Sequence, residues 1–237
     1  MNELNQNSAG GTSSSGLVSI RKNVLWIALF ATAMGLLEAI CVVYLRQLIN
    51  PAGIELSHAP TVFHGTRIEH VRELCTMIML FTVAWLVGIN GRTRAAYFFL
   101  MFGIWDITYY AGLKWFVNWP SSLIEWDCLF LIPKAWHGPV LAPVLISVYL
   151  IFACTLLLLR EHANAPLRIS FPVLGLTLLG FLVWYGSFVK DTDRIQTHGY
   201  VKVDYSWLLF ALGMVLCLIG VAMAFLQSKR FNPRDIS

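Results

Sequence analysis

Ionisable side chains interrupt several long apolar stretches of this chain, and these are the residues whose types could do chemistry. Asp106 lies in the middle of one apolar run with Lys114 two helical turns later, and Glu38 lies in another run. A charged carboxylate at the centre of a bilayer costs about 3 kcal/mol on insertion scales, so each should face a partner or a polar space inside the protein. Such carboxylates can exchange protons, bind cations or act as general acids and bases.

The elements that position these residues are predicted to be membrane-spanning helices. Of the 237 residues, 57% are hydrophobic and 13% are charged, against about 25% charged in soluble domains. Apolar runs of about 20 residues have the length needed to cross a bilayer. The sequence therefore predicts an all-α, polytopic fold with six transmembrane helices, at residues 24–45, 74–90, 95–117, 139–159, 171–189 and 206–226.

The remaining segments are predicted to flank one compact bundle. Residues 1–18 are rich in Ser and Gly and are predicted to be a disordered polar tail, residues 19–228 form the six-helix bundle, and residues 229–237 form a basic tail. Ala31-Thr32-Ala33 matches a signal-peptide cleavage site, but the apolar run continues to full spanning length, which favours a retained helix.

Six spans place both termini on the same side of the membrane. With the termini in the cytoplasm, nine Lys and Arg lie inside and the other eight of the 17 lie outside, so the count alone hardly decides the orientation. The inside loops are short and basic, whereas the outside loops are longer and carry compensating acids. Because short loops follow the positive-inside rule best, we predict cytoplasmic N- and C-termini.

Many of the polar residues then gather towards the outer end of the bundle. Asp106, Tyr110 and Lys114 follow one another at four-residue steps and share a broad helix face. We predict an outward-facing polar cavity lined by Glu38, Glu69, Glu73, Asp106, Tyr110, Lys114, Asp127 and His137. The alternative is that Asp106 with Lys114, or Glu38 with Arg72, are simple ion pairs that fix the helix register.

The segment between the third and fourth spans is rich in tryptophan. Ser122 with Glu125 three residues later matches a capping box, which predicts a short interfacial or re-entrant helix. This helix would either anchor the protein at the membrane surface through its aromatic residues or act as a lid that brings Asp127 and His137 over the cavity.

The signals for a cofactor or a macromolecular ligand are weak. His70, Glu73, Asp127 and His137 are candidate metal ligands by type, although no spacing among them requires a metal. The five cysteines are scattered singly, which suggests neither a disulfide framework nor a thiolate site. The net charge of +4 is spread over the loops and gives no nucleic-acid footprint. The sequence identifies no cofactor, and membrane lipids and partner subunits are the expected contacts.

Two blocks of sequence carry a resemblance. Gly103-Ile104-Trp105-Asp106-Ile107-Thr108-Tyr109-Tyr110, and Trp119-Pro120 through Trp136-His137-Gly138-Pro139-Val140-Leu141-Ala142-Pro143, are similar to a group of bacterial multi-pass membrane proteins with no assigned activity. The resemblance covers about the first 150 residues. It implies a bacterial inner-membrane location and assigns no functional residue.

Three functions fit these observations. In the first, the cavity handles protons, ions or a small solute, alone or within a larger assembly, with Glu38 and Asp106 as the exchanging groups and Lys114 tuning them. In the second, Glu73, Asp127 and His137 serve a membrane enzyme that acts on a lipid-like substrate at the outer interface, with or without a metal. In the third, the chain is a structural subunit and its aromatic segment is a docking surface.

Overall fold

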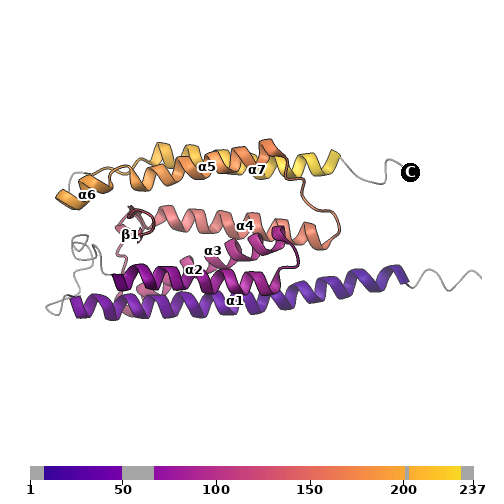
Figure 1. Cartoon of the computed structure of the whole chain (residues 1–237), viewed down its shortest axis with the longest axis horizontal. Coiled ribbons are helices and arrows are strands. Elements are labelled where there is room, and N and C mark those ends of the chain that lie inside the picture. The colour runs from indigo at the N-terminus through magenta and orange to yellow at the C-terminus, as the bar shows by residue number, and fades with distance from the viewer. Residues whose placement is uncertain (1–7, 50–66, 201–202, 231–237) are drawn as a thin grey trace, which may run out of the picture.

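In the described part of the chain, six long helices each run antiparallel to the next (Figure 1). The computed structural model describes residues 8–49, 67–200 and 203–230. Within them the helices are α1 (Ser8–Ile49), α2 (Arg67–Val87), α3 (Gly91–Val117), α4 (Leu141–His162), α5 (Phe171–Val189), α6 (Thr192–His198) and α7 (Trp207–Arg230). The N-terminal end of α1 and the C-terminal end of α7 lie at the same end of the bundle (Figure 1). The predicted all-α class is confirmed.

Five of these segments are long and apolar enough to cross a membrane: Asn23–Leu45, Arg67–Val87, Leu141–His162, Phe171–His198 and Trp207–Lys229. Helix α3 is not among them, although its 27 residues extend about 40 Å at the usual helical rise. It contacts α1, α2 and α4, so much of its surface faces protein. A helix in that position can carry polar residues that a lipid-facing helix cannot.

Several helix boundaries differ from those expected. Helix α1 begins at Ser8, so residues 8–18, predicted to be disordered, are helical; residues 1–7 lie outside the described part. Once an apolar helix is nucleated, each residue added at its end gains a backbone hydrogen bond at little cost. Helix α2 ends at Val87 rather than Asn90, because the Asn90 side chain accepts a hydrogen bond from the Thr93 backbone nitrogen and begins α3.

The loop predicted before the last span also contains helix α6, and α5 has the predicted bounds of Phe171 to Val189. Helix α7 runs to Arg230, so the first two residues of the predicted basic tail are helical. Residues 231–237 of that tail lie outside the described part of the chain.

Small residues bring α1 and α3 into close contact. A Cβ atom added at Gly35 would lie 2.5 Å from the Trp105 carbonyl oxygen, and Ala39 packs against Gly112. Helices in lipid associate through such close packing rather than through hydrophobic burial. The contact fixes the rotation of α1 and directs the neighbouring Glu38 into the bundle, where it is buried.

The predicted interfacial or re-entrant helix is replaced by a β-hairpin. Strands β1 (Trp126–Phe130) and β2 (Trp136–Pro139) pair antiparallel, with Cys128 opposite His137. The residues read as a capping box close a single turn instead, in which the Glu125 backbone nitrogen donates to Ser122 O at 3.0 Å. The Glu125 carboxylate turns back to accept hydrogen bonds from Ser121 and the Trp119 indole, so it is not available to start a helix.

The helices form two layers of unequal size (Figure 1). Helices α1 to α4 share one apolar core that includes Ile27, Leu80, Tyr97, Met101 and Leu158. Helices α5 and α7 pack against each other and join α4 and the hairpin through a cluster that contains Tyr149, Trp184, Phe188 and Phe210. The hairpin therefore lies where both layers meet. It is at the end of the bundle opposite the N-terminal end of α1 and the C-terminal end of α7 (Figure 1).

Candidate functional site

A cavity of about 60 Å³ lies between the first three helices and the hairpin. This is space for a few water molecules or a solute of similar size. Helices α1, α2 and α3 supply its polar side chains, and β1 with the residue after it closes one wall. The lining residues are Glu38, Val42, Glu69, Arg72, Glu73, Trp105, Asp106, Tyr109, Tyr110, Cys128, Leu129, Phe130 and Leu131.

Carboxylates outnumber basic groups in this lining. Glu38, Glu69, Glu73 and Asp106 contribute four acids, all of them buried, whereas Arg72 is the one basic residue among the described lining residues. If every group is ionised, their formal charges add to −3. Buried charge of one sign is costly unless it is compensated, so protons or cations that neutralise it would be stabilised in this cavity.

Arg72 holds two of the four acids. Its guanidinium forms an ion pair with Glu38 of α1, and its Nε and Nη2 atoms donate to Glu69 Oε2 at 3.1 and 3.0 Å. Thr76 Oγ1 also donates to Glu38 Oε2 at 3.1 Å. This group joins α1 to α2 and is the register-fixing pair that the sequence offered as an alternative to a functional role for Glu38.

Glu73 fastens the hairpin to α2. Both of its carboxylate oxygens lie 3.0 Å from the backbone nitrogen of Leu131, the residue that follows β1. No ion pair to Glu73 is present among the described residues. Its hydrogen bond in the described structure therefore comes from a neutral donor.

Asp106 likewise makes its hydrogen bond with a neutral group. Ser147 Oγ of α4 donates to Asp106 Oδ2 at 2.8 Å, and this bond joins α3 to α4. One helical turn later, Tyr110 donates to Asp127 Oδ2 at 3.1 Å and connects the cavity with the buried carboxylate of β1. Hydrogen-bonding groups thus continue from the cavity into the hairpin.

The structure brings five of the eight predicted cavity residues into one lining: Glu38, Glu69, Glu73, Asp106 and Tyr110. Asp127 lies next to them through Tyr110. Lys114 does not pair with Asp106, and its side chain is exposed. Because α3 ends only three residues later, the Lys114 ammonium reaches the loop and donates to Pro120 O at 2.9 Å. His137 is buried outside the lining, and its Nδ1 lies 3.1 Å from the Tyr200 hydroxyl oxygen.

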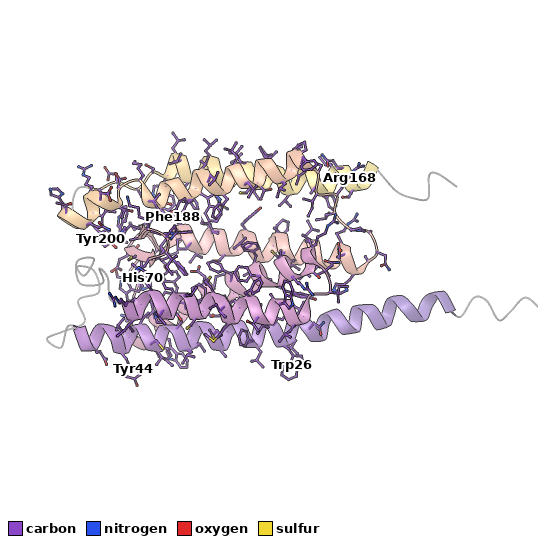
Figure 2. The ribbon with its side chains drawn as sticks, in the orientation of Figure 1. Trp26, Tyr44, His70, Arg168, Phe188 and Tyr200 are labelled. Carbon is purple, nitrogen blue, oxygen red and sulfur yellow. The ribbon has the colours of Figure 1, made fainter. Side chains whose placement is uncertain are left out.

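The candidate metal ligands are engaged separately. His70 is exposed at the hairpin end of α2, Glu73 binds Leu131, Asp127 binds Tyr110, and His137 contacts Tyr200 (Figure 2). No group of three His, Cys, Asp or Glu in the described part of the chain is arranged to hold a metal ion.

Several residues of the site were not predicted as cavity residues, among them Arg72, Trp105 and Ser147. The sequence indicated Arg72 only as a pairing partner of Glu38, and Trp105 only within a block that carries the resemblance. It did not indicate Ser147. The polar run Glu69 to Glu73 is the signal that points to Arg72, because an arginine three residues after a glutamate on a helix faces it. A serine in an otherwise apolar span gives no comparable signal.

Trp105 also carries an unsatisfied donor. The residue is only 5% exposed and lines the cavity, and its indole nitrogen has no hydrogen-bond partner in the described part of the molecule. A buried N–H without an acceptor costs about 1–3 kcal/mol, so a bound water or ligand that accepts from it would be stabilising.

The chain was also compared with known proteins. No protein-family model, curated protein or solved structure matches it.

Proposed function

We propose that this chain is an integral protein of a bacterial inner membrane whose acidic cavity binds and exchanges protons, ions or a small solute, alone or as a subunit of a membrane complex. In this proposal α3 is the sixth spanning helix, shielded from lipid by α1, α2 and α4. The cavity then lies within the membrane, near one of its surfaces.

Two aromatic residues on α1 support this placement. Trp26 and Tyr44 are exposed and point away from the bundle (Figure 2). They are separated by 18 residues, or about 27 Å of helix, which is close to the thickness of a bilayer's hydrocarbon core. Trp and Tyr concentrate at the two membrane surfaces. Glu38 lies between them, six residues or about 9 Å before Tyr44.

The observation that carries the proposal is the imbalance of charge in the cavity. Arg72 is shared by Glu38 and Glu69, whereas Glu73 and Asp106 accept hydrogen bonds from neutral donors. Glu73 and Asp106 are therefore the acids we assign to proton or cation exchange. Glu38, held by Arg72, organises the site, and Lys114 has no part in it.

The distribution of basic residues supports an outward-facing cavity. Arg168 lies at the end of the bundle opposite His70 and Tyr200 (Figure 2). Arg92 and Arg94 lie in the first turn of α3, Arg160 lies in the last turn of α4, and Lys229 lies in the last turn of α7, all at that same end. Short basic connections remain in the cytoplasm, so the hairpin and the cavity belong to the outer side.

Reconstitution tests the proposal directly. The full-length protein is placed in liposomes with an internal pH dye, and proton movement is followed under imposed gradients of protons and of monovalent cations. We expect wild-type protein to dissipate at least one gradient and Asp106→Asn to lose most of that flux. Asp193→Asn is the matched control, because this carboxylate is 83% exposed and pairs with Lys134 outside the cavity.

Equal flux in wild-type, Asp106→Asn and protein-free liposomes would contradict the proposal.

Affinity purification from native membranes decides separately whether the chain works alone or in a complex. A stable partner retained by wild type and by Asp106→Asn, but lost in Trp126→Ala, would favour the structural-subunit hypothesis.

A further inference from the structure

We infer that the cavity recognises a small organic ammonium solute that also carries a hydrogen-bond acceptor, as an amino alcohol does. This inference rests on the proposed function and narrows its ligand. Three independent features of the lining carry it: two acids that form no ion pair with any described residue, a set of aromatic rings, and one donor that lacks an acceptor in the same part of the chain.

The two acids define the charge of the ligand. Glu73 and Asp106 each have a bond to a neutral donor within the described structure, from Leu131 N and Ser147 Oγ, and their remaining lone pairs can accept more. An ammonium group brings a positive charge and several N–H donors into a small volume. Hydrogen bonds between such a group and carboxylates are about twice as strong as those between neutral groups.

The aromatic rings favour an organic cation over a metal ion. Trp105, Tyr109, Tyr110 and Phe130 line the cavity beside the acids. Aromatic faces attract ammonium groups through cation–π interactions and pack against attached carbon atoms. Mg²⁺ and Ca²⁺ instead require six or more oxygen ligands, including water, and the described residues contain no cluster suited to a metal ion.

The unsatisfied donor defines the second part of the ligand. The Trp105 indole nitrogen is buried without an acceptor in the described structure, and Trp105 and Asp106 both line the cavity. A ligand whose ammonium binds Asp106 can place an oxygen a few bonds away against this N–H. The cavity volume of about 60 Å³ limits the solute to a handful of non-hydrogen atoms.

Ethanolamine and propylamine are a matched pair of probes, because a methyl group replaces the hydroxyl in the second. We would measure binding of each by calorimetry and thermal unfolding with full-length protein in phosphatidylglycerol nanodiscs, with NaCl as the metal-ion control. We expect ethanolamine to bind saturably, propylamine to bind about tenfold more weakly, and sodium to give no saturable signal. Asp106→Asn should weaken both amines, and Asp193→Asn should weaken neither.

Trp105→Phe tests the role of the indole N–H while keeping an aromatic ring. It should remove the difference between the two amines by lowering ethanolamine affinity about tenfold and leaving propylamine affinity unchanged. Because this readout compares two ligands on one variant, a general loss of stability cannot imitate it. An unchanged preference for ethanolamine would overturn the assignment of the donor.

The same ammonium chemistry occurs in a free solute and in a lipid headgroup, and the membrane composition distinguishes them. If a headgroup is the natural ligand, nanodiscs that contain phosphatidylethanolamine should raise the unfolding temperature and weaken ethanolamine binding. If a free solute is the ligand, that lipid should change neither. Saturable sodium binding or proton flux without amine binding would overturn this inference and leave the proposed function intact. Absence of sodium binding, of proton flux and of amine binding would overturn both this inference and the proposed function.

Discussion

Glu73 and Leu131 join two elements that are far apart in sequence: both carboxylate oxygens of Glu73 on α2 lie 3.0 Å from the Leu131 backbone nitrogen at the end of β1. One of the cavity's acids is thereby also the attachment point of the hairpin that closes one cavity wall. A proton or cation that binds this carboxylate competes with the hairpin for the same oxygen atoms. We therefore predict that occupancy of the cavity and mobility of the hairpin are coupled through this bond.

Removing the Glu73 carboxylate should loosen the hairpin. In Glu73→Ala the Leu131 N–H loses its acceptor, at a cost of about 1–3 kcal/mol, so amides of residues 126–139 should exchange with deuterium about tenfold faster or more. Hydrogen–deuterium exchange with mass spectrometry on the protein in nanodiscs measures this. Glu161→Ala is the control, because Glu161 binds Asn90 outside the cavity and should leave hairpin exchange unchanged. Equal hairpin exchange in wild type and Glu73→Ala would show that the bond does not hold the strand.

The close approach of α1 and α3 should not tolerate a methyl group at Gly35. A Cβ there would lie 2.5 Å from the Trp105 carbonyl oxygen, so Gly35→Ala must push the helices apart and should destabilise the protein by about 1–3 kcal/mol. Gly175 on α5 has open space around it, and Gly175→Ala should be neutral or stabilise by about 0.5–1 kcal/mol through helix propensity. Thermal unfolding in one detergent compares the two variants. Similar stability of both would contradict the packing of α1 on α3.

Apolar run length predicted where each long helix lies along the chain, although not the bounds of all of them. Helix α5 has the predicted bounds because polar residues flank an uninterrupted apolar stretch on both sides. The hairpin could not be predicted in this way, because a short aromatic run has no period that separates strand from helix. The apparent capping box was misleading for another reason: the Glu125 carboxylate accepts hydrogen bonds from Ser121 and Trp119, which precede it, instead of capping a helix that begins at Ser122.

The polar site was predictable where residues share one helix, and less so where helices meet. Asp106 and Tyr110 line the same cavity because four-residue spacing keeps them on one face, but Lys114 lies close enough to the end of α3 to reach the carbonyl oxygen of Pro120. The Asp106–Ser147 bond depends on the rotation of α4 against α3, and no pattern within either helix specifies that angle.

Acid should remove the stabilisation that Glu125 gives to the turn before the hairpin. Partial burial raises its pKa, but hydrogen bonds from the Ser121 side chain, the Ser121 backbone and Trp119 outweigh this and hold the pKa below its usual value. A carboxylate with a lowered pKa stabilises the fold above its unfolded pKa of about 4.3, and this contribution is lost as the pH falls through the folded value. Wild type should therefore be more stable than Glu125→Gln at pH 7, and the difference should shrink below about pH 4. Thermal unfolding across this pH range measures it, and a difference that grows in acid would contradict the assigned bonds.

The proposed orientation predicts which turns a membrane-impermeant thiol reagent can reach. Ser122 lies in the exposed turn before β1, and Ala163 lies in the exposed turn after α4, at the other end of the bundle. Neither substitution to cysteine removes a buried contact, so Ser122→Cys and Ala163→Cys should both fold. In intact cells the reagent should label Ser122→Cys above the level of the unmodified chain and should label Ala163→Cys only after the cells are lysed. The opposite pattern would place the cavity on the cytoplasmic side and leave its acids as described. Labelling of both sites in intact cells would contradict a transmembrane position for α4, because α4 separates the hairpin from Ala163 by a helix of 22 residues, about 33 Å long and comparable to the hydrocarbon thickness.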